Sequence, residues 1–315
     1  MCPVIDLGIL RLPSYSVWVL LGAIAFTVVT IILIEKVEKA EPAITNRILI
    51  LSVFGFAVLG GAAFLMNSLF HSIEKQKLVF GGITWLGGVI WAFPFMILMI
   101  HKFCPRVKGE ALRFFNLLVP GIALAHGFGR IGCFMAGCCY GKRTDGIFGV
   151  SFPAGSTAAN QYPAPDGGSL PVLPTQLFEA IFELLLFVVM MLTYKKLKRH
   201  FLEVYAFSYG AFRFLLELAR GDSRGATGLG LTPSQIMSIV LMLMGLAALL
   251  YGRGIIFKKT RERMAELKEA RLCSNEGAEV ERITNTLREL KALADEGVIT
   301  ADEFEEKKKE LLNRL

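Results

Sequence analysis

Long apolar runs are the feature that most restricts the fold of this chain. About seven of them have roughly the 17 to 25 residues that an α-helix needs to cross a bilayer. The runs are 15–34, 48–66, 79–100, 114–134, 176–194, 205–219 and 232–251, of which 205–219 is short and charged. Hydrophobic residues make up 54% of the 315 residues and charged residues only 19%, a composition that excludes an ordinary soluble domain. The sequence therefore predicts an all-α, polytopic membrane protein.

The placement of Lys and Arg predicts how the chain lies across the membrane. Connections rich in these residues face the cytoplasm. The first, third and fifth connections and the tail after residue 251 are richer in them than the alternate connections. We therefore expect the N-terminus outside and the C-terminus inside. The net charge of +7 is explained by these cytoplasmic segments, for which anionic headgroups are the natural partner, and nothing indicates nucleic-acid binding.

Polar chemistry gathers at the end of the fourth apolar run, where residues 126–145 read HGFGRIGCFMAGCCYGKRTD. Charge inside such a run is costly, so we expect Arg130 to have a function. His126 lies one helical turn before Arg130, and a lone histidine of this kind is more often a packing residue. A glycine-rich helix-packing segment with charged ends is the alternative interpretation of this composition.

The run at 205–219 carries the second informative pattern. Arg213, Glu217 and Arg220 are spaced four and three residues apart, so a helix places them on one face. Together with Arg130 they predict a cationic pocket near the outer leaflet. Such a pocket suits a phosphate, because arginine presents a planar fork of donors. A purely structural network of buried ions is the alternative.

Further features lie on the same predicted outer side. Tyr15 stands at the mouth of the first run, where a tyrosine is usually a membrane anchor. The connection 146–173 is rich in Gly, Pro, Ser and Ala, and at this length an ordered loop is more often a lid or cap than a passive connector. It leads into PTQLFE, residues 174–179. Glu179 and Glu183 lie one turn apart there, and a carboxylate simply turned away from lipid is the interpretation we favour for Glu183.

The cysteines suggest a separate chemistry. Cys133, Cys138 and Cys139 form a CxxxxCC cluster near the oxidising side, where they could form a disulfide or bind a metal. Their spacing matches no strong zinc or redox pattern, so both interpretations stay open.

Taken together, these motifs resemble the prolipoprotein diacylglyceryl transferase family. GRIGCFMAGCCYG at 129–141 is similar to the family signature G-R-x-G-N-F-x-N-x-E-x-x-G. Other matches follow in order over roughly residues 10–255: Tyr15, the GGxxxxGG frame at 81–88, PTQLFE, YGxFRFxxE from Tyr209 with Arg220 beyond it, and LTPSQIMS at 231–238. Seven spans with an outside N-terminus are also the family's topology. The sequence departs from the pattern at Leu86, where the family has a histidine, and at Cys133, Ala136 and Cys138, where it has asparagine, asparagine and glutamate.

The resemblance implies transfer of the diacylglyceryl group from phosphatidylglycerol to the thiol of a lipobox cysteine in prolipoprotein signal peptides. A thioether forms and glycerol phosphate leaves, and this chemistry requires no metal, nucleotide or other cofactor. The expected setting is the bacterial cytoplasmic (inner) membrane, with the active site toward the periplasmic face. The expected catalytic residues are Arg130, Arg213, His126, Glu217 and Tyr15. The expected substrate-binding residues are Gly81, Gly87, Cys133, Cys138, Gly141, Tyr209, Arg220, Gln176 and Glu179.

The departures leave a second hypothesis open. If the family histidine activates the incoming thiol, this protein uses another group, for which His126 is the obvious substitute. The alternative is a catalytically divergent homologue that binds anionic phospholipid or serves as a membrane scaffold or thiol protein, because fold resemblance alone does not fix activity.

The composition changes after the last apolar run. We expect a transmembrane domain at 1–257, a charged linker at 258–280 and a cytoplasmic helical hairpin at 281–315 that resembles the SHOCT-type short C-terminal module. Thr300 and Glu303 form a capping box for its second helix. Because about 35 residues bury little core alone, we expect self-association or docking.

Overall fold

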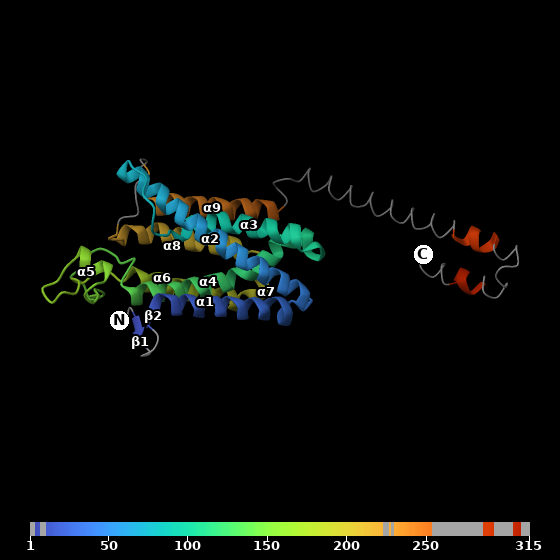
Figure 1. Ribbon diagram of the computed structural model, residues 1–315, viewed down its shortest axis with the longest axis horizontal. Helices are drawn as coiled ribbons and strands as arrows, with labels where there is room; N and C mark the ends of the chain where they lie inside the picture. The colour runs from blue at the N-terminus through green and yellow to red at the C-terminus, as the bar shows by residue number, and fades with distance from the viewer. Residues whose placement is uncertain are drawn as a thin grey trace. The chain divides into compact units, whose positions relative to one another are not determined.

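The computed structural model describes residues 4–6, 11–222, 227, 230–253, 286–292 and 305–309. The chain divides into two compact units, Met1–Leu249 and Leu250–Leu315. The first is a helical bundle preceded by a short antiparallel ribbon, β1 (Val4–Asp6) and β2 (Arg11–Pro13), in which Val4 lies opposite Pro13 (Figure 1). In the second, residues 286–292 and 305–309 are helical, and the rest of the expected hairpin, including its capping box, lies outside the described residues.

The bundle confirms the predicted all-α class. Its long helices are α1 (Ser14–Ile31, continued by the π-helix η1, Ile32–Val37), α2 (Pro42–Lys75), α3 (Trp85–Phe103), α4 (Ala111–Ala136), α6 (Thr175–Leu192), α8 (Phe201–Leu216) and α9 (Pro233–Gly252). Four short elements join them: η2 (Pro105–Glu110), α5 (Thr157–Gln161), α7 (Tyr194–Leu197) and η3 (Glu217–Ala219). Among the described residues, six helices are long and apolar enough to cross a membrane. The 16-residue α8 corresponds to the short, charged run, and the seven-span count and the orientation stay predictions.

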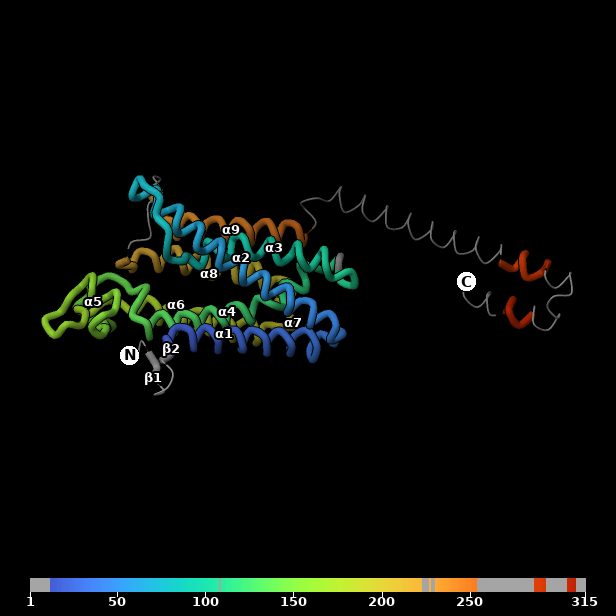
Figure 2. Tube along the Cα trace, viewed as in Figure 1, coloured from blue at the N-terminus to red at the C-terminus, as the bar shows by residue number. Residues whose placement is uncertain are grey.

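Helix α4 is the buried centre of the bundle. In its most apolar window 67% of the residues are buried, against 22% to 44% for the other five candidate spans. Helix α1 packs antiparallel along it so closely that a Cβ at Gly22 would lie 2.9 Å from the Ala125 carbonyl oxygen (Figure 2). Helices α6, α8 and α3 also pack against α4, so polar side chains on their facing surfaces are shielded from lipid.

The end of α4 folds back on itself. Gly137 takes a left-handed conformation with φ +69°, and its N–H donates to the Phe134 carbonyl at 3.2 Å. The Cys138 N–H donates to the Cys133 carbonyl at 3.2 Å, which completes the pattern of a Schellman cap. Cys139 follows with φ +65°, unusual for a residue other than glycine. The cap therefore brings the residues after the helix back over its last turn.

The loop between α4 and α6 is ordered around a small core of its own, made by Tyr140, Phe152, Ala158 and Val172. A backbone hydrogen bond of 2.8 Å from Gly141 N–H to the Leu173 carbonyl closes the loop on itself, and one of 2.8 Å from Lys142 N–H to the Ala219 carbonyl attaches it to η3. We call the end of the bundle that carries this loop the loop end.

Candidate functional site

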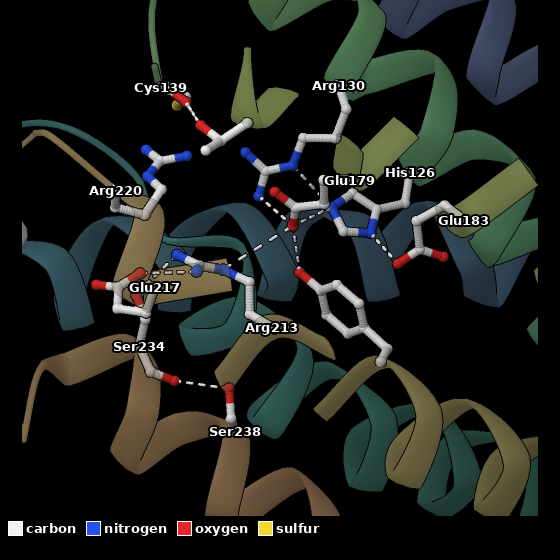
Figure 3. A network of polar contacts seen from close by, with 12 residues as sticks. His126, Arg130, Cys139, Glu179, Glu183, Arg213, Glu217, Arg220, Ser234 and Ser238 are labelled. Carbon is white, nitrogen blue, oxygen red and sulfur yellow. Dashed lines mark hydrogen bonds and ion pairs between the residues drawn. The ribbon is translucent and has the colours of Figure 1, made fainter. Parts of the chain in front are cut away.

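Buried charged and polar side chains gather where α4, α6 and α8 meet toward the loop end (Figure 3). Arg130 comes from α4, Glu179 from α6 and Arg213 from α8, and each is less than a tenth exposed. All three were predicted as site residues, and the structure brings them together. Since they come from three helices, the packing around α4 is what assembles the site.

The Glu179 carboxylate is at the centre of this cluster. Its Oε1 lies 3.0 Å from Arg130 Nη2, 3.8 Å from His126 Nε2 and 3.9 Å from Arg213 Nε. The same oxygen accepts a hydrogen bond of 2.7 Å from the Tyr209 hydroxyl. One fully buried carboxylate thus holds two guanidinium groups and a tyrosine in a fixed arrangement.

His126 is held on both sides of its ring. Arg130 Nε donates to Nε2 at 3.2 Å, so Nδ1 carries the proton in the neutral ring and donates to Glu183 Oε1 at 2.8 Å. The Trp85 ring stacks on the imidazole with centroids 4.3 Å apart. Both nitrogens are therefore engaged in this conformation, and a role as general base stays a prediction.

Arg213 is fixed by its own helix and by α9. Its Nη1 lies 2.7 Å from Glu217 Oε2, the i,i+4 pair that the sequence predicts, and its Nη2 donates to Ser234 Oγ at 3.0 Å. Arg220, just after η3, forms a two-pronged contact with Asp222 through Nε at 2.8 Å and Nη2 at 2.7 Å. Each arginine of the cluster therefore has an acidic neighbour, so anion binding here depends on directed donors more than on bare positive charge.

Some buried polar atoms in the cluster make no hydrogen bond within the protein. Nη1 of Arg220 is one of them, because Asp222 contacts only Nε and Nη2 of that guanidinium group. A buried donor without an acceptor costs about 1 to 3 kcal/mol, and charged oxygens of a phosphate are suitable acceptors. This nitrogen is therefore available to an anionic ligand, which fits the predicted phosphate pocket.

Three thiols lie at the edge of the cluster. The sulfur atoms of Cys133, Cys138 and Cys139 are all within 4.8 Å of one another, and none of these residues forms a disulfide. Helix α6 fixes their backbone, because Gln176 Nε2 donates to the Cys138 carbonyl at 2.7 Å and Thr175 Oγ1 to the Cys139 carbonyl at 2.9 Å. Electrostatic interactions connect Tyr15 with these thiols and with Arg130, so the start of α1 also borders the cluster.

The other predicted residues serve the packing around the site. Gly141 pairs with Arg220 in a backbone bridge, which ties the loop to the segment after α8. Gly81 accepts a hydrogen bond of 2.6 Å from Asn67 Nδ2, and a Cβ at Gly87 would lie 2.8 Å from Met66 Cβ. These two glycines therefore support the contact between α2 and α3, and their role in substrate binding stays a prediction. In the loop, burial raises the pKa of Tyr140 to about 12, and its hydroxyl donates to Gln161 Oε1 at 2.5 Å.

Sequence reasoning missed several members of the cluster. Trp85, Ser234 and Asp222 were not considered. For Glu183 the favoured interpretation was a carboxylate simply turned away from lipid. The signal for Glu183 was its carboxyl group one turn after Glu179 in an apolar helix. Ser234 had a weaker signal in the LTPSQIMS motif, and nothing in the sequence pointed to Trp85.

Comparisons with known proteins agree with the geometry. The profile of the family described as "Prolipoprotein diacylglyceryl transferase" matches residues 3–251, and that of "Short C-terminal domain" matches residues 285–312. A phosphatidylglycerol–prolipoprotein diacylglyceryl transferase of Clostridium tetani is 30% identical over 245 residues, 75% of this chain and 92% of the relative. Transferase 2 of Clostridium perfringens is 33% identical over 244 residues, 75% and 90% of the two chains. The enzyme of Francisella tularensis subsp. mediasiatica is 30% identical over 204 residues, 62% and 69%.

Proposed function

Since the chain belongs to the prolipoprotein diacylglyceryl transferase family, we propose that its reaction, the transfer of diacylglyceryl from phosphatidylglycerol to prolipoprotein, takes place at the cluster around Glu179. The observation that carries this placement is the buried Nη1 atom of Arg220, which makes no hydrogen bond within the protein. The lipid phosphate supplies a charged oxygen that would complete the hydrogen bonding of this group.

The reaction breaks the carbon–oxygen bond between the diacylglyceryl group and the phosphate. The lipobox cysteine sulfur forms a bond to that carbon, the electron pair of the broken bond leaves with the phosphate oxygen, and the thiol proton is released. Negative charge grows on the departing phosphate, and fixed donors aimed at it stabilise the transition state. Arg220 supplies such a donor, because Asp222 holds its Nε and Nη2 and leaves Nη1 for the phosphate. Arg213 adds a second guanidinium group beside it, held by Glu217 and Ser234.

Arg130, His126 and Glu179 form the second part of the proposed machinery. Arg130 is held at both Nε and Nη2, by His126 and Glu179 respectively, so its orientation is set before substrate binds. In this arrangement His126 is a positioning residue whose own orientation comes from Glu183. Tyr209 and Tyr15 border the same space and would contact the substrates.

The setting of the reaction follows from the membrane topology. The cluster lies toward the end of α4 that carries the loop, and the charge pattern of the sequence assigns this end to the outer face. We place the enzyme in the bacterial cytoplasmic membrane with the site facing outward. At the other end of the chain, residues 281–315 would form a cytoplasmic hairpin after a charged linker, 258–280, and self-associate because so small a module buries little core.

The test is transfer of labelled diacylglyceryl from phosphatidylglycerol to a lipobox peptide by the full chain in detergent. Arg220→Gln should lower the transfer rate by at least about 100-fold, as removal of a transition-state donor does. The matched control is Arg143→Gln, a half-exposed arginine on the loop, which should keep the wild-type rate. Wild-type protein that is folded and binds phosphatidylglycerol without forming thioether would refute the proposal and favour the lipid-binding alternative.

A further inference from the structure

The three clustered thiols are not used by the reaction as described above, although they border it. Two features of the fold bring them together. The Schellman cap returns Cys138 to the last turn of α4, where Cys133 lies, and Cys139 follows directly with a left-handed backbone. A non-glycine residue in this conformation is energetically unfavourable and is found most often at functional sites.

The spacing of the sulfur atoms suits a metal ion. Zinc binds thiolate sulfur at about 2.3 Å, which places three such ligands about 3.8 to 4.0 Å apart. The three sulfur atoms are already within 4.8 Å of one another, so small side-chain rotations would close the set. Catalytic zinc sites have three protein ligands and an open fourth position, whereas structural sites use four. The cluster offers three ligands, the number found in catalytic zinc sites.

The electrostatic surroundings also suit such an ion. Zinc with three thiolates carries one net negative charge, and a fourth thiolate adds another. Arg130 interacts electrostatically with Cys133 and Cys139, and Arg220 with Cys139. Figure 3 shows Cys139 and Arg220 on the same side of the cluster. Arg220, which contacts the lipid phosphate in the proposed reaction, and Arg130, which belongs to the same site, therefore also lie next to the thiols.

We propose that Cys133, Cys138 and Cys139 hold a zinc ion whose fourth position binds the thiol of the prolipoprotein cysteine. The inference rests on the proposed function, which supplies that thiol. A thiol bound to zinc is deprotonated, so the metal provides the thiolate that attacks the lipid. It also explains how the chain works without an available base near the site, since both nitrogens of His126 are engaged and the aliphatic Leu86 stands where the family has a histidine.

The step balances without an oxidant or a reductant. On loading, each cysteine exchanges its proton for the metal. The substrate thiol then binds at the fourth position and its proton passes to water. The sulfur electron pair forms the new bond to the diacylglyceryl carbon as the bond from that carbon to the phosphate oxygen breaks. Glycerol phosphate leaves, and the product dissociates because a neutral thioether is a weaker ligand than a thiolate.

The first experiment measures metal content. The full chain is purified in detergent under reducing conditions without chelator, and zinc is determined by elemental analysis. We expect about one zinc ion per chain, and at least about a tenfold loss in Cys133→Ser, Cys138→Ser and Cys139→Ser. Cys104→Ser, which changes a buried cysteine just after α3, is the matched control and should retain its zinc. Wild-type protein without zinc, or zinc that survives all three substitutions, would overturn the proposal.

The second experiment asks whether the substrate thiol joins the metal. Zinc is replaced by Co²⁺, whose thiolate charge-transfer absorption grows with the number of bound thiolates. A lipobox peptide should raise this absorption by roughly a third, as four thiolates replace three, and the same peptide with serine for cysteine should not. A spectrum that the cysteine peptide leaves unchanged would refute the open fourth position, because a purely structural zinc behaves in this way.

Activity separates this inference from the proposed function. Zinc removal by a chelator should abolish thioether formation and re-addition of Zn²⁺ should restore it. Full activity in zinc-free protein would overturn the metal site and leave the transferase intact. A protein whose Co²⁺ form shows the absorption increase with peptide, but whose zinc form makes no thioether, would sustain the site and contradict the proposed reaction.

Discussion

Arg130 Nη2 and Glu179 Oε1 are 3.0 Å apart, with both side chains buried and each on a different helix. This ion pair joins α4 to α6 at the level of the site. The same carboxylate oxygen faces Arg213 and accepts from Tyr209, so the geometry of the arginines depends on it. We expect the cluster to respond to small changes at Glu179 more strongly than to changes at its edges.

Glu179→Gln tests this dependence. The amide keeps the shape of the side chain but removes the charge opposite two buried guanidinium groups. We expect the transfer rate to fall by roughly 100-fold and the free energy of unfolding by about 3 to 5 kcal/mol, the usual cost of leaving a buried ion without its partner. Transfer assays and thermal unfolding in detergent measure the two effects. Glu74→Gln, at a partly exposed pair with His71, is the control, and equal effects of the two variants would contradict the central role of Glu179.

Two tyrosines allow a comparison within one helix. The Tyr209 hydroxyl donates to the Glu179 carboxylate at 2.7 Å, whereas the Tyr205 hydroxyl lies 3.5 Å from Glu183, at the limit of a hydrogen bond. Tyr209→Phe should therefore lower the free energy of unfolding by about 1.5 to 3 kcal/mol, the range for hydrogen bonds to charged groups. Tyr205→Phe should cost less. Denaturant titration of both variants measures the two free energies of unfolding. A larger loss for Tyr205→Phe would mean that the shorter contact, between Tyr209 and Glu179, is not the stronger one.

Gly141 is predicted to tolerate no side chain. A Cβ there would lie 2.7 Å from the Ala219 carbonyl oxygen and 2.7 Å from Leu173 Cβ, in the place where the loop joins the segment of Arg220. Gly141→Ala should destabilise the protein by about 1 to 3 kcal/mol through overpacking. Gly60→Ala in α2 is the control, since a Cβ there meets nothing within 4 Å and should stabilise the helix slightly. The thermal midpoints should thus move in opposite directions, and equal shifts would refute the argument.

Much of the fold could be predicted from local patterns. The long helices follow the apolar runs, and the pair of Arg213 and Glu217 forms at 2.7 Å because a four-residue spacing on one helix fixes it. Contacts between helices were harder to predict. Glu183 holds His126 from 57 positions away in the sequence, and Trp85 stacks on the same ring from a third helix. Neither contact has a local signal, because the crossing of helices creates it.

The thiol cluster shows a different limit. The spacing between Cys133 and Cys138 matches no strong metal-binding motif, because such motifs assume a turn or a loop between ligands. Here the intervening residues end a helix, and the left-handed Gly137 shortens the path between the two cysteines. The glycine itself was visible in the sequence. Its conformation, which decides the distance between the thiols, was not.

The last prediction concerns the end of the bundle opposite the loop end. Glu38, just after η1, accepts from Lys198 at 2.5 Å, from Arg113 at 2.7 Å and from Tyr194 at 2.8 Å. Burial raises the pKa of this carboxyl, but the hydrogen bonds from Lys198, Arg113 and Tyr194 outweigh it and lower the pKa from 4.5 to about 2. Because the folded-state pKa is the lower one, the ionised carboxylate stabilises the fold at pH values above 4.5.

That contribution should disappear as the pH falls from 4.5 toward about 2. Glu38→Gln should therefore unfold at a lower temperature than the wild type at pH 7, and the gap between the two midpoints should close across this acidic range. Glu110→Gln is the matched control, because Glu110 also pairs with Arg113 but is half exposed, and exposed pairs contribute about 0 to 1 kcal/mol. Thermal unfolding in detergent at a series of pH values measures the gap. A gap that stays constant down to the acidic limit would show that Glu38 stabilises the fold by packing and not by its charge.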